Sequence, residues 1–177
     1  MRLYIRLLYV VLSALWRKKD RPFSGESVLA FTVMPWDCVV QYMGNDRYHA
    51  FMDLGRIDLM IRLGAWDSVI RNRLQPFVLS VHIRHQQRLR RFQKFVLRTR
   101  LVHTDSRFFL MEHIFQNGTQ IMATALSKNG LTCHDRIVAT GPILKHTSWQ
   151  LGSYEAQHVF TIDDIGALLL HLRRRIK

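Results

Sequence analysis

The sequence predicts an α+β domain in which one antiparallel sheet wraps around a long, buried helix. One observation is the segment 48–63, which has helical periodicity and apolar residues on most of its sides. The other is a series of segments after residue 75 in which apolar and polar residues alternate, as strands require. A helix that is apolar on most sides must be covered, and a curved sheet is the cover that these strands offer.

Length and charge narrow the class of protein. The chain has 177 residues, of which 48% are apolar, so it is long enough for one domain with a real core. Its 26 Lys and Arg outnumber its 13 Asp and Glu, which gives a net charge of +13. This excess indicates an anionic partner, such as nucleic acid, an acidic membrane or a phosphate-bearing small molecule, or else it serves solubility alone. We expect no nucleic-acid partner, because the aromatic residues alternate as core residues and form no stacking motif.

Cysteine and histidine usage argues against disulfides and metal. The two cysteines, Cys38 and Cys133, form no CxxC motif, so a disulfide framework is not expected and a reducing, cytoplasmic environment is. His82 and His85 lie three apart on a predicted strand, where alternation sends them to opposite faces. We therefore predict no metal site.

The chain divides into three parts. Residues 1–22 are expected to form an amphipathic helix and a linker, residues 23–147 the main domain, and residues 148–177 a linker with a second amphipathic helix. In that second helix, residues 161–177, Thr161 and Asp164 have the spacing of a capping box, and a basic cluster closes the chain.

The N-terminal segment supports two interpretations. Its apolar run from Leu7 to Trp16 is too short to span a bilayer. Arg2, Arg6 and Arg17 fall with Ser13 on one stripe of a helical wheel, and the rest is mostly apolar. Residues 1–19 are therefore expected either to lie in a membrane interface with their apolar face down, or to dock on the domain or on a dimer partner.

Within the main domain, residues 27–35 are predicted to form a strand that ends at Pro35. The helix 48–63 follows, with a polar stripe of His49, Asp53 and Arg56. Asp58 and Arg62 are four residues apart and are expected to pair, and Gly64 is expected to end the helix.

Four strands are predicted after this helix, over residues 77–85, 92–101, 107–116 and 119–128. Asn117-Gly118 between the last two is a strong hairpin signal, because both turn residues must reach positive φ. We expect an antiparallel meander. In its first strand the residues predicted to share one face are Phe77, Leu79, Val81 and Ile83.

The segment VMPWDCV…YMGNDRYHAFMDLGRIDLMIRLG resembles the hot-dog fold thioesterases, in particular the 4-hydroxybenzoyl-CoA thioesterase-like group. That group carries a motif close to P-x-D-x-D, then H-M-N-N-x-R-Y and an aromatic-rich helix, and the resemblance covers roughly residues 27 to 145. It implies a hot-dog fold, a homo-oligomer (dimer or tetramer), an acyl-CoA substrate, and a site between subunits near the start of the central helix. It also implies hydrolysis of the thioester by a carboxylate, without metal or cofactor.

The resemblance suggests three catalytic candidates, each with a structural alternative. Asp37 matches the first motif aspartate and is expected to act as base, or to cap a turn. Asn45 would orient the substrate carbonyl or a water, or cap the backbone. Asp53 lies one turn into the helix, where some hot-dog branches place the carboxylate; alternatively it pairs with Arg56. Asp46 is expected to be the N-cap of the helix.

The substrate-binding candidates come from the motif and from charge. Tyr42, Arg47 and Tyr48 stand at motif positions. The densest basic cluster is expected to bind the phosphates of CoA and contains Arg84, Arg88, Arg90 and Arg91.

The sequence departs from the motif at two central positions. Val39 stands in place of the second aspartate, with Cys38 as its expected spatial equivalent, and Tyr42 stands in place of the histidine. The alternative function is therefore a non-catalytic hot-dog protein that binds acyl-CoA or lipid, or that acts as an interaction module at a membrane surface.

Overall fold

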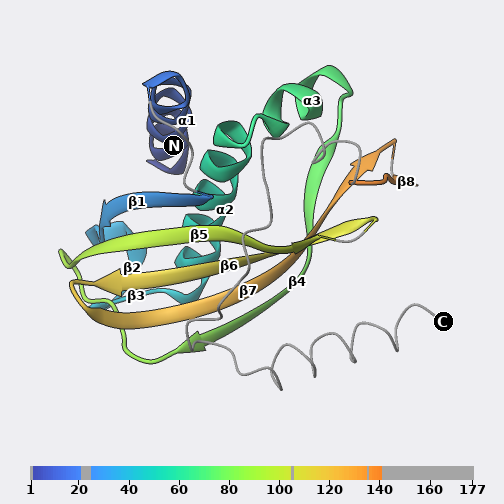
Figure 1. The fold of residues 1–177 in the computed structure, drawn as a ribbon. Helices are drawn as coiled ribbons and strands as arrows, with labels where there is room; N and C mark the ends of the chain where they lie inside the picture. Colours follow the sequence, from blue (N-terminus) through green and yellow to red (C-terminus); the bar gives the residue numbers. More distant parts are fainter. Residues whose placement is uncertain (1, 21–24, 105, 135, 141–177) are drawn as a thin grey trace.

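The computed structural model describes residues 2–20, 25–104, 106–134 and 136–140 (Figure 1). The predicted C-terminal segment 148–177 lies outside the described residues. The elements in chain order are α1 (Arg2–Asp20), β1 (Glu26–Thr32), a 3-10 turn η1 (Pro35–Asp37), β2 (Cys38–Val39), β3 (Tyr42–Met43), α2 (Asn45–Arg62), α3 (Ala65–Arg71), β4 (Gln75–His85), β5 (Lys94–Thr104), β6 (Phe108–Asn117), β7 (Gln120–Cys133) and β8 (Arg136–Ile137).

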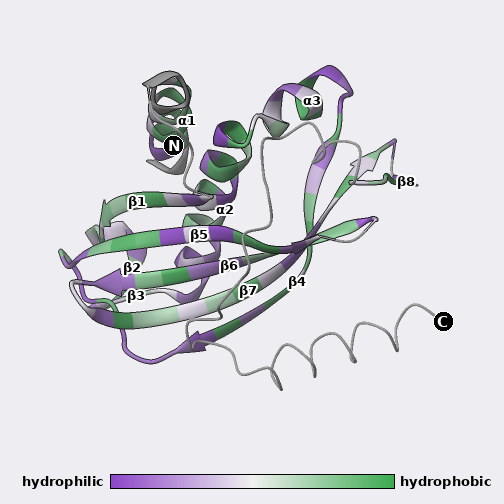
Figure 2. Cartoon of the chain, viewed as in Figure 1, coloured by the Kyte–Doolittle hydropathy of each residue, from purple (hydrophilic) through white to green (hydrophobic). Residues whose placement is uncertain are grey.

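The long strands form one antiparallel sheet that curves around α2, which confirms the predicted α+β hot-dog arrangement (Figure 1). The strand order is β1-β5-β6-β7-β4, and β8 pairs with β7. Figure 2 shows hydrophobic residues along α2 and along the strands that enclose it. The core on this side of the sheet includes Phe51, Phe95 and Phe115, whose rings pack edge to face or tilted against one another.

The predicted meander is correct for β5, β6 and β7 and wrong for β4. β4 pairs with β7 at the far edge of the sheet instead of lying beside β5. The reason is that the free side of β5 is taken by β1, which pairs with it from Glu26↔Arg100 to Thr32↔Lys94. The connection 86–93 therefore crosses the end of the sheet, where Leu89 accepts a hydrogen bond from the Met43 N–H (2.9 Å).

A β-bulge also corrects the predicted facing of β4. The pairing with β7 shifts between Val78 and Ser80, which leaves Leu79 out of the ladder and exposed. Val81 and Ile83 pack against the core as predicted. Phe77 lies opposite Gly130 and therefore on the other face of the sheet, because one extra residue reverses the alternation.

The central helix begins earlier than predicted. It starts at Asn45, its N-cap is Gly44, and Asp46 lies within its first turn, so the prediction that Asp46 is the N-cap is wrong. A Cβ at position 44 would come within 2.7 Å of an Asp46 carboxylate oxygen. At the other end Gly64 adopts a φ of +76°, which ends α2 as predicted.

The predicted pair within α2 is confirmed, with 3.9 Å between Arg62 Nη1 and Asp58 Oδ2. Asp58 is fully buried and also accepts a hydrogen bond from the Ser27 hydroxyl (2.6 Å), which fixes the C-terminal half of α2 to β1. About one turn nearer the N-terminus of α2, a Cβ at Gly55 would lie 2.3 Å from Thr99 Oγ1. The helix and β5 can approach this closely only because residue 55 has no side chain.

α1 lies on the domain, against α2, as one of the two interpretations expected (Figure 1). Val10 and Ala14 are fully buried, and Leu7 packs against the core. In the described parts of the chain, no helix is both long enough and apolar enough to cross a membrane.

A buried histidine lies below the close approach of α2 and β5. His113 Nδ1 is 3.1 Å from Thr99 Oγ1, and its Nε2 is 3.0 Å from Ser127 Oγ, so the ring joins β5, β6 and β7. Complete burial, aided by the positive charge of Arg56, lowers the pKa of His113 well below its usual value. The imidazole is therefore neutral in the folded protein at neutral pH.

We predict that this histidine makes stability fall with acid. Its folded pKa is lowered, so its contribution is complete above about pH 6.5 and is lost as the pH falls below that value, where only the unfolded chain takes up the proton. Urea unfolding between neutral pH and pH 5 should show that His113→Gln removes a slope of about 1.4 kcal/mol per pH unit. His103→Gln, at an exposed position, is the control; equal slopes in both variants would contradict the prediction.

Candidate functional site

The segment between β1 and α2 folds into a compact junction at the start of α2. It consists of η1 and the short hairpin β2–β3. The Gly44 N–H donates to the backbone carbonyl of Asp37 (2.9 Å), which closes the hairpin onto the first turn of α2. Four sequence candidates, Asp37, Tyr42, Asn45 and Arg47, therefore lie in one small region.

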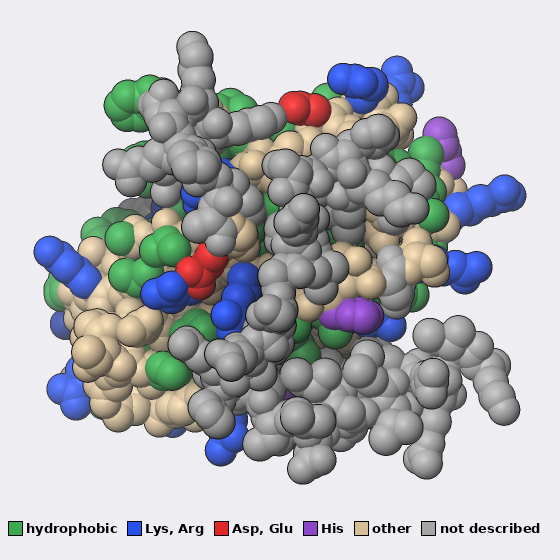
Figure 3. Space-filling model, viewed as in Figure 1, with side chains coloured by type: hydrophobic (Ala, Val, Ile, Leu, Met, Phe, Trp, Pro, Cys, Tyr) green, Lys and Arg blue, Asp and Glu red, His purple; other side chains and the backbone are tan. Residues whose placement is uncertain are grey.

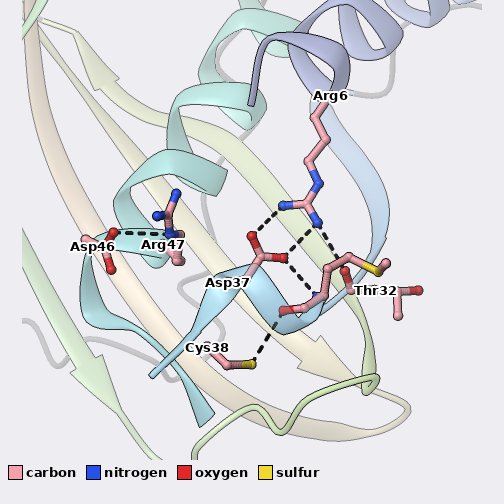
Figure 4. A network of polar contacts seen from close by, with 7 residues as sticks. Arg6, Thr32, Asp37, Cys38, Asp46 and Arg47 are labelled. Carbon is pink, nitrogen blue, oxygen red and sulfur yellow. Dashed lines mark hydrogen bonds and ion pairs between the residues drawn. The ribbon is translucent and has the colours of Figure 1, made fainter. Parts of the chain in front are cut away.

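The Asp37 carboxylate is buried and occupied by structural partners (Figure 4). Arg6 of α1 binds it with both guanidinium nitrogens, Nη1 to Oδ1 at 2.9 Å and Nη2 to Oδ2 at 2.7 Å. The Met34 N–H also donates to Oδ2 (2.9 Å), so Asp37 caps the 3-10 turn. Capping of a turn was the structural alternative to a role as base. Both carboxylate oxygens are held by these hydrogen bonds and the side chain is only 2% exposed, so this carboxylate has little access to a water molecule.

Cys38 and Val39 supply no replacement for the missing carboxylate. The Cys38 thiol donates to the Met34 carbonyl (3.5 Å). Burial raises the pKa of the Cys38 thiol, and the negative charge of Asp37 raises it further, so the thiol stays protonated and unreactive at neutral pH. Val39 is exposed on the hairpin.

The crossing segment 86–93 forms a hollow of about 810 Å³ beside the hairpin. We call it the arginine hollow; among the residues that line it are Tyr42, Gln86, Arg88, Arg90, Arg91 and Met122. The guanidinium carbons of Arg88 and Arg90 lie 5.5 and 6.0 Å from the centre of the Tyr42 ring. The Arg91 N–H donates to the Gln41 carbonyl (2.9 Å), which anchors the crossing segment to the hairpin.

Two other basic candidates lie elsewhere. Arg84 of β4 lies opposite Thr124 of β7. The residue before it, Ile83, faces the core, so the Arg84 side chain points to the face of the sheet away from α2. Arg47 forms an ion pair with Asp46 (3.2 Å) on the exposed first turn of α2. The structure therefore brings together three of the four arginines in the predicted phosphate-binding cluster, Arg88, Arg90 and Arg91, and leaves Arg84 apart.

Tyr48 has a structural position. It is buried, its ring packs edge to face against His85 and Phe115, and its hydroxyl accepts the Leu89 N–H (3.5 Å). Burial raises the pKa of Tyr48 and lowers that of His85. Tyr48 thus fixes the crossing segment over the start of α2 and positions the arginine hollow.

A second, smaller pocket of about 260 Å³ lies along the middle of α2. We call it the apolar pocket; its lining includes Asp53, Arg56, Ile57, Met60, Trp66, Val78, Phe109 and Asn129. Asp53 forms an ion pair with Arg56, which is the structural alternative to a catalytic role that the sequence offered. The Asp53 side chain nevertheless remains 56% exposed. Arg56, which the sequence placed on the polar stripe of the helix, is buried.

Two buried polar atoms in the walls of this pocket have no hydrogen-bond partner among the described residues. They are Arg56 Nη1, a donor, and Asn129 Oδ1, an acceptor. Unpaired buried polar atoms are costly in free energy, and they are found where a ligand or water completes the pairing.

Comparison with known proteins identifies the family. Residues 33–145 match the family model of the thioesterase-like superfamily. The chain belongs to this superfamily. A search of curated proteins finds no match.

Solved structures with a similar fold include thioesterases of low sequence identity. A probable thioesterase from Escherichia coli, YbaW, is 15% identical with a TM-score of 0.61, over 67% of this chain and 92% of that one. A mutant 4-hydroxybenzoyl-CoA thioesterase complexed with 4-hydroxybenzoyl-CoA is 12% identical with a TM-score of 0.63, over 69% and 98%. The gentisyl-coenzyme A thioesterase BH1999 is 18% identical with a TM-score of 0.56, over 60% and 90%. The hot-dog fold expected from the sequence is thereby confirmed.

In this thioesterase-like protein, Asp53 lies apart from the other two catalytic candidates, Asp37 and Asn45. Asn45 and Asp53 are eight residues apart on α2, which is about 12 Å along the axis at 1.5 Å per residue. No hydrogen bond of the exposed Asn45 side chain is found among the described residues. Asp53 is thus the candidate carboxylate that is both accessible and next to a pocket.

Sequence reasoning missed two residues of the apolar pocket. The sequence places Arg56 on the polar stripe of the helix and names it as a partner of Asp53, and it gives no sign that the guanidinium lines a pocket. Asn129 stands in a second Asn-Gly pair, at 129–130, which reads as a turn but lies in the middle of β7.

We predict that loss of the Asp37 carboxylate destabilises the fold. Asp37→Ala leaves the guanidinium of Arg6 and the Met34 N–H without their partner, at a cost of about 2–4 kcal/mol in the free energy of unfolding. Asp46→Ala removes an exposed partner of Arg47 and should change that free energy by less than about 0.5 kcal/mol. Urea unfolding measures both, and equal small losses would show that the Arg6–Asp37 pair contributes little.

Proposed function

We propose that this chain is an acyl-CoA thioesterase in which Asp53 acts as the catalytic carboxylate. The observation that carries the proposal is the exposed Asp53 carboxylate at the mouth of a mostly apolar pocket, while Asp37 is bound to Arg6. Membership of the thioesterase-like superfamily supports the reaction class. The acyl group would occupy the apolar pocket and present its thioester carbonyl to Asp53.

In this proposal Asp53 acts as a general base. It takes a proton from a water molecule while the water oxygen bonds to the thioester carbonyl carbon. The tetrahedral intermediate collapses, the C–S bond breaks, and the CoA thiolate leaves and takes up the proton, so that the products are the free acid and CoA. Arg56 binds Oδ1 of Asp53 and so directs the other oxygen, Oδ2, toward the water.

The arginine hollow is the proposed binding site for the CoA phosphates. Arg88, Arg90 and Arg91 bring three guanidinium groups to one open hollow, and guanidinium groups bind phosphate through paired hydrogen bonds. The adjacent Tyr42 ring offers a flat aromatic surface on which another aromatic or planar group can stack.

The hollow and the pocket lie near opposite ends of β4. Val78 borders the apolar pocket and His85 precedes the crossing segment, about 23 Å away at 3.3 Å per residue. β4 pairs with β7 on one side, and the described residues place no strand on its other side. All its residues are at least partly exposed, including the apolar Val78 and Leu79.

We propose that two copies of the chain pair antiparallel through β4 and so complete the site. An open, eleven-residue strand edge with apolar side chains is a template for strand addition. Antiparallel pairing about a two-fold axis near Ser80 would bring the Val78 end of one protomer beside the His85 end of its partner. The apolar pocket of one subunit would then adjoin the arginine hollow of the other, which fits one acyl-CoA.

The role of Asp53 is tested by thiol release from a panel of acyl-CoA thioesters, from acetyl to palmitoyl and aromatic. Asp53→Asn should lower kcat by on the order of 10² to 10⁴ with little change in KM, because it removes the base and keeps the shape. Asp46→Asn, an exposed carboxylate on the same helix, should keep wild-type rates.

Two results would decide against this role. Full activity in Asp53→Asn with loss in a folded Asp37→Asn would transfer the role to Asp37. Binding of acyl-CoA by the wild type without hydrolysis of any thioester would favour the non-catalytic alternative, for which the occupied Asp37 carboxylate is the supporting observation.

The arginine hollow is tested by a substrate that lacks the nucleotide. Arg88→Gln with Arg90→Gln should raise KM for acyl-CoA roughly tenfold or more, because charge-assisted hydrogen bonds to phosphate are lost. KM for the same acyl group on N-acetylcysteamine should not change. Arg84→Gln, on the other face of the sheet, is the matched control, and an equal rise in KM for both thioesters would contradict phosphate binding.

The dimer is tested at the bulge of β4. Leu79→Lys would place two like charges near the two-fold axis, and it should shift sedimentation from dimer to monomer and abolish activity. Ile70→Lys, an exposed apolar position on α3, should leave both unchanged. A fully active monomer would overturn the shared site while leaving the role of Asp53 intact.

A further inference from the structure

The outward side of α1 is apolar. Large hydrophobic side chains along it are between 49% and 74% exposed, and Figure 3 shows hydrophobic side chains at the surface around this helix. We call them the outer face of α1: Tyr4, Ile5, Leu8, Tyr9, Leu12, Leu15 and Trp16. Contiguous apolar patches of this kind are rare on monomeric proteins and mark a surface that another molecule covers.

Contacts on the inward side of α1 fix the orientation of the helix on the domain. Val10 and Ala14 are buried against the domain, and two members of the sequence's polar stripe, Arg6 and Ser13, also lie on the partly buried side. Arg6 reaches Asp37 with two hydrogen bonds, and its guanidinium carbon is 4.9 Å from the centre of the Phe51 ring. The ion pair therefore fixes α1 with Arg6 and Ser13 on its inward side and its apolar face outward, the reverse of a helix adapted to water.

We propose that the outer face of α1 docks on an anionic membrane surface. The face combines aliphatic residues with Tyr4, Tyr9 and Trp16, and tyrosine and tryptophan favour the interface between lipid and water. The helix carries five basic residues and one acidic residue, Asp20, and its last turns contain Arg17, Lys18 and Lys19. Basic residues at the ends of an interfacial apolar helix bind anionic headgroups, and the net charge of +13 adds to that attraction.

Charge argues for lipid over a second copy of the chain. Two α1 helices packed face to face, parallel or antiparallel, would bring their basic ends together, with only one acidic residue on each helix to offset the repulsion. An anionic lipid surface neutralises the same charges. The charges of α1 are therefore complementary to an anionic lipid surface, whereas they would repel a second copy of the same helix.

Docking in this orientation would set one end of the domain beside the lipid. The β2–β3 hairpin, which directly follows Asp37, carries exposed apolar side chains at Val39 and Val40, and Trp36 of η1 is also exposed. Arg6 ties this hairpin to α1, so both segments belong to the same end of the molecule (Figure 4). The membrane contact does not depend on the proposed hydrolysis and is tested separately.

The test is co-sedimentation of the full chain with vesicles of phosphatidylcholine alone and of phosphatidylcholine with roughly one-third phosphatidylserine. Leu8→Gln with Leu12→Gln alters two exposed positions, so the fold should persist, as circular dichroism can check. This variant should lose on the order of tenfold or more in partition to the anionic vesicles. Ile70→Gln with Ile137→Gln, two exposed apolar positions away from α1, should partition as the wild type does.

Three outcomes would overturn the proposal. One is no partition of the wild type to anionic vesicles, and a second is equal partition of the wild type and the Leu8→Gln, Leu12→Gln variant. The third is a lipid-free assembly that this variant dissociates, seen by sedimentation velocity, together with no vesicle binding; α1 would then be a contact between copies. Partition of the wild type that is strong with phosphatidylserine and weak without it supports the proposal.

Discussion

The structure depends on the burial of one helix by one sheet. α2 has apolar residues around most of its surface, and a single curved sheet with α1 on the open side provides its cover. The helix and the sheet approach closely at Gly55, where Thr99 leaves no room for a side chain. Next to that contact, the neutral His113 joins three strands through Thr99 and Ser127, so the same layer fixes the distance from helix to sheet and the alignment of the strands.

The wrapping of α2 also decides where the candidate functional residues lie. Because β1 occupies the free side of β5, β4 must pair at the far edge, and the connection 86–93 must cross the end of the sheet. That crossing brings Arg88, Arg90 and Arg91 to Tyr42, although they are far apart in sequence. The bulge at Leu79 places Val78 on the side of α2, at the wall of the pocket that holds Asp53.

The pair of Arg6 and Asp37 links the junction to the surface of the molecule. It occupies the carboxylate that the sequence motif presents as a base, and it turns the apolar face of α1 toward the outside. One ion pair thus separates a structural aspartate from the accessible Asp53 and sets the orientation of the N-terminal helix.

The sequence by itself determined the fold class, the long buried helix, its end at Gly64, the hairpin at Asn117-Gly118 and the membership of a thioesterase group, because periodicity, turn chemistry and a local motif are all short-range signals. It could not place β4, since strand order depends on which edges other strands leave free. Nor could it distinguish Asp37 from Asp53, because the partner that occupies Asp37 lies 31 residues away on another helix. Only the tertiary structure decided which charges are buried, which carboxylate stays accessible, and which face of α1 meets the solvent.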